Sequence, residues 1–273
     1  MTASLAPPAD AFGQHHAALG RDARIVSLVP SITELLCDLG LAAQLVGRTG
    51  FCIHPREALR QVPKVGGTKD VKLERIRELA PTHVIVNVDE NPRPVAEALS
   101  AFVPNVVVTH PGAPEDNRAL YALMRHLFDC QRAAARLTAE LDAALAAARA
   151  VGAAVPPESV LYLIWREPWM TVSRDTYIAA TLATVGWQTV PAEAGDRYPS
   201  FDWQAPWVGQ AQRVLLSTEP YRFQDKHLAE VAALCGRPVQ LIDGEWTSWY
   251  GSRAVAGLRA LAALRQALAN ARA

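Results

Sequence analysis

The chain has 273 residues, of which 50% are apolar, and this is enough to build two cores of ordinary domain size. Its 27 lysines and arginines balance its 27 aspartates and glutamates, so no net charge favours nucleic acid or an acidic membrane as a partner. No window reaches the roughly 18 consecutive apolar residues of a membrane span, and the four cysteines lack the spacing of a zinc or C-x-x-C site.

Residues 1–23 form a Pro/Ala-rich segment that we predict to be a flexible arm, with His15 and His16 in solvent. The segment has neither the basic region nor the apolar region of a secretory signal. The sequence as written therefore predicts a cytoplasmic protein, whereas a misassigned start codon would allow a periplasmic one.

Residues 24–115 alternate between strand and helix patterns and predict an N-terminal α/β lobe. Apolar runs predict strands at 24–30, 45–48, 82–88 and 105–110. Amphipathic segments predict helices at 31–40, 55–62, 71–81 and 92–102. Such alternation is typical of a parallel sheet, whose ligands gather at the carboxyl ends of the strands.

Residues 116–151 carry leucines at helical spacing and predict one continuous helix. Asp116 can cap its start, and Gly152 followed by Pro156 ends it. At about 1.5 Å per residue the helix would be roughly 50 Å long, which is more than one lobe needs, so we predict a backbone helix that connects two lobes. A coiled-coil or oligomer contact is the alternative.

Residues 152–273 repeat the α/β pattern and predict a C-terminal lobe. Strands are expected at 159–165, 169–173, 213–219 and 239–245, and helices at 174–186, 227–236 and 248–271. The predicted fold class is therefore α/β, with two Rossmann-like lobes joined by one long backbone helix and a ligand cleft between the lobes.

Polar and aromatic side chains follow the predicted strands in both lobes and are the candidate ligand-binding residues. The candidates are Ser31, Phe51, His54, Thr68 and Asp89 in the first lobe, and Arg166, Trp169, Arg197, Tyr198, Tyr221, Glu245 and Trp246 in the second. Aromatic side chains crowd the second set, which suits stacking on a flat or bulky ligand, although core packing is the alternative for each. Trp187 is predicted to lie in the core.

The same loops offer chemistry that leaves alternatives open. Cys52 and His54 could act as nucleophile and base, although no G-x-S-x-G or similar motif accompanies them. A metal could be held by a set of loop residues, namely His54, Asp89, Glu219 and Glu245. Arg166 and Arg197 could receive carboxylates or phosphate, or form salt bridges with the neighbouring Glu167 and Asp196.

Four stretches of the sequence together resemble a known family. They are RIVSLVPSITELLCDLG, VGGTKDVKLERIRELAPTHVIV, PWMTVSRDTYI and DGEWTSWYGSR. They are similar to the helical-backbone substrate-binding proteins that serve ABC importers of cobalamin, haem and ferric siderophores, and most similar to the cobalamin-binding members. The resemblance implies two α/β lobes on a rigid helix with only small hinge motion.

The resemblance also assigns roles to particular positions. It places Phe51 against the ligand, and it places His54 where several relatives have an acidic residue or tyrosine. Thr68 replaces a stacking tryptophan, whereas Glu245 and Trp246 keep the family's Asp-Trp pair in kind. Of the two glutamates that dock on the permease, Glu74 is present and Ser248 stands at the position of the other.

The resemblance and the loop residues together predict a non-catalytic substrate-binding protein with no intrinsic cofactor. Its ligand is expected to be a bulky metal chelate, first cobalamin or another corrinoid, with haem or a ferric siderophore as further candidates. An ABC-importer permease is the expected partner, although Ser248 at the second docking position weakens this expectation. The alternative is a cytoplasmic metal-dependent or Cys/His enzyme that acts on a small substrate in the cleft.

Overall fold

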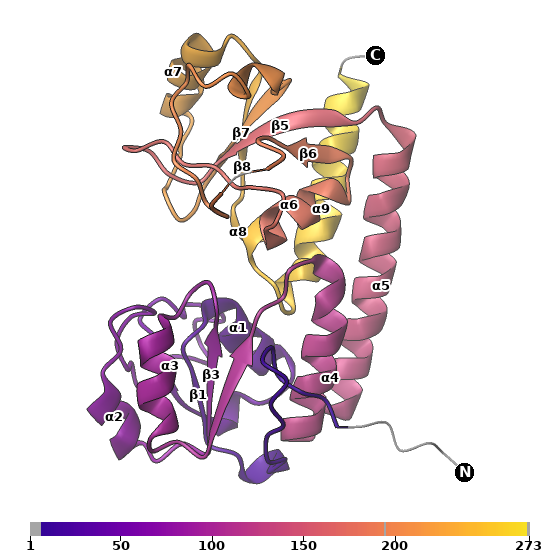
Figure 1. Cartoon of the computed structure of the whole chain (residues 1–273). Coiled ribbons are helices and arrows are strands. Elements are labelled where there is room, and N and C mark those ends of the chain that lie inside the picture. Colours follow the sequence, from indigo (N-terminus) through magenta and orange to yellow (C-terminus); the bar gives the residue numbers. More distant parts are fainter. Residues whose placement is uncertain (1–6, 194, 272–273) are drawn as a thin grey trace. The chain divides into compact units, whose positions relative to one another are not determined.

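The computed structural model describes residues 7–193 and 195–271, which form two compact units (Figure 1). The first unit comprises 7–111, 116–139 and 250–252, and the second comprises the other described residues. Each unit is built on a four-stranded parallel sheet, so the predicted class of two α/β lobes is confirmed. Within the described residues, no helix combines the length and the apolar character that a bilayer span requires.

The sheet of the first unit has the strand order β2-β1-β3-β4. Its strands are β1 (Ile25–Ser27), β2 (Leu45–Arg48), β3 (His83–Asn87) and β4 (Asn105–Thr109). Its helices are α1 (Pro30–Asp38), α2 (Leu73–Glu78), α3 (Arg93–Ser100) and α4 (Asn117–Phe128), with short 3-10 turns at Gly20–Asp22, Ala42–Gln44 and Pro114–Asp116. The predicted helix at 55–62 is wrong, because that segment forms only turns.

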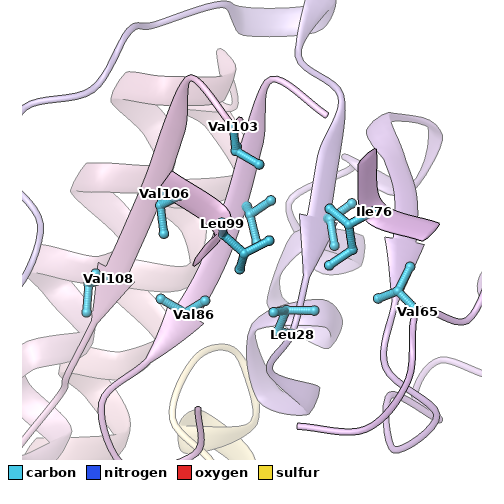
Figure 2. Close-up of a cluster of buried hydrophobic side chains, with 10 residues drawn as sticks. Leu28, Val65, Ile76, Val86, Leu99, Val103, Val106 and Val108 are labelled. Carbon is cyan, nitrogen blue, oxygen red and sulfur yellow. The ribbon is translucent and has the colours of Figure 1, made fainter. Parts of the chain in front are cut away.

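The core of the first unit follows from β-branched residues that alternate along β3 and β4. Val84 and Val86 face α2 and α3 together with Val106 and Val108, and Figure 2 shows Leu99 of α3 packed over these strands. His83 and Ile85 point to the opposite face, where His83 contacts the ring of Phe128 in α4 at 5.1 Å between ring centroids. The sheet is therefore covered on both faces, as parallel sheets are.

The predicted single helix over 116–151 is wrong, because the structure has two helices there. α4 ends at Phe128 and α5 (Gln131–Ala154) begins after Asp129, whose φ of 53° is left-handed. The carbonyl of Leu127 accepts a hydrogen bond from the backbone N–H of Leu19, and Cys130 starts the next helix by accepting from Ala134. The boundary between the two units falls inside α5, between Ala139 and Glu140.

The second unit repeats the topology of the first, with the strand order β6-β5-β7-β8. Its strands are β5 (Glu158–Leu163), β6 (Trp187–Thr189), β7 (Arg213–Ser217) and β8 (Val239–Ile242). Its further helices are α6 (Tyr177–Ala183), α7 (Lys226–Cys235), α8 (Glu245–Ser248) and α9 (Arg253–Asn270), with a 3-10 turn at Val208–Gln210. Within this unit, α7 lies on one side of the sheet and α6 and α9 lie on the other (Figure 1).

Two expectations for the second unit are wrong. Residues 169–173 make only isolated bridges through Met170, and the fourth strand is instead β6, which begins at the buried Trp187. The closing helix over 248–271 is interrupted at 249–252, so that α8 and α9 are separate. The prediction that Trp187 lies in the core is confirmed.

The described part of the N-terminal segment is packed on the first unit, so the prediction of a flexible arm is wrong for residues 9–23; residues 1–6 lie outside the described part. His16 is buried and lies 2.9 Å from Asp10 through Nε2 and Oδ2. Ala11 N–H donates to the carbonyl of Val108 in β4, and His83 Nε2 lies 2.8 Å from the carbonyl oxygen of Ala17. These contacts cover the edge of the sheet at β4.

Two buried titratable groups at this segment, Asp10 and His83, make the stability of the fold depend on pH. Burial alone would raise the pKa of Asp10, but hydrogen bonds from His16 and from backbone N–H groups outweigh it and lower the pKa below 3.8. Burial lowers the pKa of His83 below 6.5, against the hydrogen bond with Ala17. The stability that Asp10 contributes is therefore lost as the pH falls through its lowered pKa. His83 is accommodated in its neutral form, so its burial makes the fold less stable as the pH falls below the pKa of the unfolded chain.

The pH dependence of stability should reveal His83. Below about pH 6.5 His83 binds a proton in the unfolded chain but stays neutral in the folded chain. The free energy of unfolding should therefore fall by up to about 1.4 kcal/mol per pH unit below that pH. Urea unfolding of the wild type and of His83→Gln between pH 7.5 and pH 5 measures it. The variant should lose this part of the slope, and equal slopes would contradict the assignment.

Candidate functional site

The strand order places the candidate site at the same edge of each sheet. In both units the chain leaves the first strand toward one side and returns on the other, so the order reverses between β1 and β3 and again between β5 and β7. In parallel sheets ligands bind outside the carboxyl ends of the strands at such switch points. The loops at the carboxyl ends of these four strands, and of the strands beside them such as β2, are therefore the candidates.

The carboxyl edge of the first unit exposes apolar side chains. Phe51 and Ile53 follow β2 and are 63% and 56% exposed, and Val88 follows β3 and is 41% exposed. Phe51 lies over Gly67, where an added Cβ would come within 3.3 Å of its ring. Large exposed apolar side chains at the carboxyl edge of a parallel sheet indicate a surface that binds a ligand or a partner.

The polar candidates of the first unit differ in exposure. Asp89 lies 3.7 Å from His110 Nε2 through Oδ2, and His54 is partly exposed on the loop after β2. The carbonyl of Thr68 accepts a hydrogen bond from Asn91 Nδ2 at 2.9 Å, which fixes that loop. Ser31 is buried in the first turn of α1. Asp89, His54 and His110 therefore offer the accessible polar groups at this edge.

Cys52 lies at this edge but is buried. Its Sγ lies 3.0 Å from Thr33 Oγ1 and 3.1 Å from Thr49 Oγ1. Burial raises the pKa of the thiol, against the hydrogen bonds from the two threonines. A buried thiol with a raised pKa is a poor nucleophile, so the geometry gives no support to a Cys52–His54 catalytic pair.

The carboxyl edge of the second unit carries an aromatic cluster, and most of its rings pack on one another. Trp169 packs edge-on against Trp203 at 5.3 Å and parallel to Phe223 at 6.2 Å between ring centroids. Tyr221 packs on Phe223 and against Trp165. Trp165 follows β5 and is 39% exposed, so it is the large apolar side chain that this cluster presents at the switch point.

The arginine candidates of the second unit are engaged with protein groups. Arg166 Nη2 lies 2.7 Å from Glu230, and Arg166 Nε lies 3.4 Å from Glu167, so the predicted alternative of a salt bridge with Glu167 is observed. Arg197 Nε donates to the carbonyl of Asp175 at 2.7 Å, and its guanidinium lies 5.8 Å from the ring centroid of Tyr198.

A third group of candidates follows β7 and β8. Glu245 opens α8 and pairs with Arg253, and Trp246 follows it on the same helix with Gly257 of α9 packed on its backbone. Ser248 Oγ donates to Glu219 Oε1 at 2.6 Å. Burial raises the pKa of Glu219, and the charges of Glu245 and Asp243 raise it further.

Metal ligation by the protein finds no support in the described residues, where no group of three or more His, Cys, Asp or Glu side chains has the arrangement to hold an ion. Glu74, the predicted docking residue, lies exposed in the first turn of α2, 3.5 Å from Arg77 Nε. The candidate list from the sequence omitted Ile53, Val88 and His110. An apolar residue or histidine directly after a strand was the signal that could have found them.

Comparisons with known proteins match this architecture. The family model described as periplasmic binding protein matches residues 25–224. The vitamin B12-binding protein of Pectobacterium carotovorum subsp. carotovorum (strain PC1) is 24% identical over 234 residues, which are 84% of this chain and 83% of that protein. The vitamin B12-binding protein of Vibrio campbellii (strain ATCC BAA-1116) is 24% identical over 246 residues, 89% of each chain.

Solved structures agree with these matches at the level of the fold. The periplasmic vitamin B12 binding protein BtuF of Vibrio cholerae superposes with a TM-score of 0.73 at 20% identity, over 89% of this chain and 98% of that chain. The periplasmic heme-binding protein RhuT from Roseiflexus sp. RS-1 gives a TM-score of 0.71 at 25% identity, over 90% and 99% of the two chains.

Proposed function

The chain belongs to the periplasmic binding protein family, and from this premise we propose that it binds a bulky metal chelate without transforming it. Cobalamin or another corrinoid is the first candidate, because the curated relatives are vitamin B12-binding proteins. Haem is the second candidate, because RhuT is a heme-binding protein. Ferric siderophores complete the set of ligands to be tested.

The observation that carries this proposal is the exposure of large apolar side chains at the ligand-binding edge. Phe51, Ile53 and Val88 on the first unit and Trp165 on the second follow strands whose carboxyl ends bind ligands in this class of sheet. When a flat macrocycle covers such apolar side chains, their removal from water favours binding. We assign the polar contacts to candidate residues on the loops of each unit, namely His54, Thr68 and Asp89 in the first and Arg166, Arg197, Tyr198, Glu245 and Trp246 in the second.

Ser31, Trp169 and Tyr221 take supporting roles in the proposal. Ser31 is buried at the start of α1, and the two aromatic rings pack within the cluster that presents Trp165. They would act by fixing the edge in shape before the ligand arrives, which lowers the entropy cost of binding.

Calorimetric and spectroscopic titration tests the proposal. We expect one of cyanocobalamin, cobinamide, haemin and a ferric siderophore to bind with a Kd of about 1 μM or tighter, which corresponds to about −8 kcal/mol. The bound ligand should shift its absorption spectrum and should be recovered chemically unchanged. The absence of heat and of any spectral change with all four ligands would overturn the proposal.

An ABC-importer permease is the proposed partner, and a periplasmic location goes with it. Glu74 is exposed on α2 and available for contact with a basic partner surface. Ser248 bonds to Glu219 within the second unit and has no carboxylate to offer. Docking through Glu74 should therefore be weak and salt-sensitive. The enzymatic alternative has no observation in its favour, since Cys52 is buried.

A further inference from the structure

Glu219 stands at the switch point of the second unit and is held in a fixed position. It follows β7 directly and is partly exposed. Ser248 Oγ donates to its Oε1 at 2.6 Å, and Gly244 approaches so closely that an added Cβ would lie 2.5 Å from its Cγ. A carboxylate fixed by two elements loses little side-chain entropy when a ligand binds.

The charge around Glu219 is negative. Asp243 and Glu245 lie close enough for their charges to raise the pKa of Glu219, after the larger effect of burial. Arg253 pairs with Glu245 and stacks over the ring of Trp249 at 4.7 Å. Besides Ser248, the side chain of Trp249 hydrogen-bonds Glu219, and Asp243 Oδ1 accepts from the backbone N–H of Glu245 at 3.1 Å. A carboxylate has about four acceptor positions on its two oxygens, so Glu219 can accept a further hydrogen bond from a ligand.

Arg166, a cation that could bind an anionic ligand at the same edge of the sheet, is already paired with protein carboxylates. Arg166, which follows β5 on the other side of the switch point, has Glu230 at 2.7 Å and Glu167 at 3.4 Å. A ligand carboxylate would therefore have to displace a protein carboxylate from Arg166 while it approached Glu219. Both steps cost free energy in a partly buried site.

The two leading ligand classes differ in the groups they would bring to this edge. A corrinoid carries uncharged carboxamides, whose N–H groups are hydrogen-bond donors, whereas haem carries two propionates. A carboxylate accepts strongly from an amide N–H and repels another carboxylate. We propose that Glu219 is a specificity-determining residue that accepts a hydrogen bond from a ligand amide, so that the protein selects amide-bearing chelates over carboxylate-bearing ones. This inference rests on the proposed function.

Two corrins that differ in their peripheral groups test this preference, and the Glu219 variant described below tests the contact itself. Cobinamide carries amides on the corrin ring, and cobyrinic acid carries carboxylates on the same ring with the same cobalt. We expect the wild type to bind cobinamide at least about tenfold more tightly at pH 7, as one charge-assisted hydrogen bond gained or lost allows. As the pH falls and Glu219 takes up a proton, the preference should narrow.

Glu219→Gln provides the direct test, because glutamine keeps the length of the side chain and an oxygen that accepts from Ser248. The variant should bind cobinamide about threefold to tenfold more weakly and cobyrinic acid more tightly, so that the two affinities converge. Glu97→Gln, an exposed carboxylate on α3 paired with Arg93, is the matched control and should keep the wild-type preference.

Each result decides between the two levels of the proposal. If Glu219→Gln leaves the relative affinity for the two corrins as it is in the wild type, the role of Glu219 is overturned while chelate binding stands. If the wild type binds no corrin and no haemin, the proposed function itself fails. Should Glu219→Gln not fold, Glu219→Asp takes its place, because it withdraws the carboxylate by one methylene group and should also narrow the preference.

Discussion

Replacing Glu158 by alanine is expected to lower the free energy of unfolding of the second unit by about 3–5 kcal/mol. Glu158 begins β5 and is buried, and its Oε1 lies 3.1 Å from Arg213 Nε. Its Oε2 lies 2.8 Å from Arg265 Nη1 and accepts from Trp187 Nε1 at 2.9 Å. Removal of this carboxylate would leave two buried guanidinium groups and an indole N–H without their acceptor, which is far more costly than loss of a surface pair.

Urea unfolding measures this loss, and tryptophan fluorescence reports on the second unit, which holds all seven tryptophans of the chain. Glu193→Ala is the matched control, because Glu193 is an exposed carboxylate of the second unit and its removal should change stability by no more than about 0.5 kcal/mol. A loss below about 1 kcal/mol for Glu158→Ala would mean that water or other groups satisfy the two arginines. The network of Glu158 with the two arginines, which connects α9 to β5 and β7, would then contribute little to the free energy of unfolding.

The two sheets were predictable because their strands are runs of valine, isoleucine and leucine separated by amphipathic helices. Residues 82–88 and 213–219, for example, contain β3 and β7. β6 has only three residues and begins with a tryptophan, so it gave no run to detect. Residues 169–173 have strand-like composition, but Met170 there pairs only through isolated bridges. Short strands depend on a neighbour, which local composition does not record.

The break between α4 and α5 could not be predicted from local periodicity. The apolar repeat continues through Leu127, Phe128 and Cys130, and all three side chains are buried. What ends α4 is a hydrogen bond from Leu19, more than a hundred positions earlier in the chain, to the carbonyl of Leu127. The same distant segment was predicted to be a flexible arm, so both errors have one cause. Tertiary contacts override local preference where a terminal segment packs.

The sequence predicted which candidate residues lie on loops after strands, but not how their side chains pair or how exposed they are. The rule that ligands bind at strand ends selected Phe51 and Asp89, which do lie on loops after β2 and β3, and their contact with a ligand stays a prediction. It could not foresee that Arg166 pairs with Glu230, 64 positions further along the chain, or that Trp169 packs within a cluster of rings. Pairing and exposure depend on which loops meet, and sequence spacing carries no information on that.

Replacing Phe51 by alanine is expected to weaken the binding of the metal chelate about tenfold and to leave the stability of the protein nearly unchanged. The ring is 63% exposed, so it contributes little to the core, whereas a macrocycle that covers it would remove most of its surface from water. Loss of such an aromatic contact costs about 1–2 kcal/mol, or roughly tenfold in Kd. Titration with whichever of the four proposed ligands binds the wild type measures the affinity, and thermal unfolding measures the stability.

Phe12 provides the control for this variant. It is also a phenylalanine of the first unit and is 72% exposed, but it lies on the N-terminal segment and not on the loop that follows β2. Phe12→Ala removes the same chemical group and should leave ligand affinity within about twofold of the wild type. If the two variants bind the ligand alike, exposure of an aromatic ring explains nothing about this site. A loss confined to Phe51→Ala instead ties binding to the carboxyl edge of β2, because position is then the main difference between the two rings.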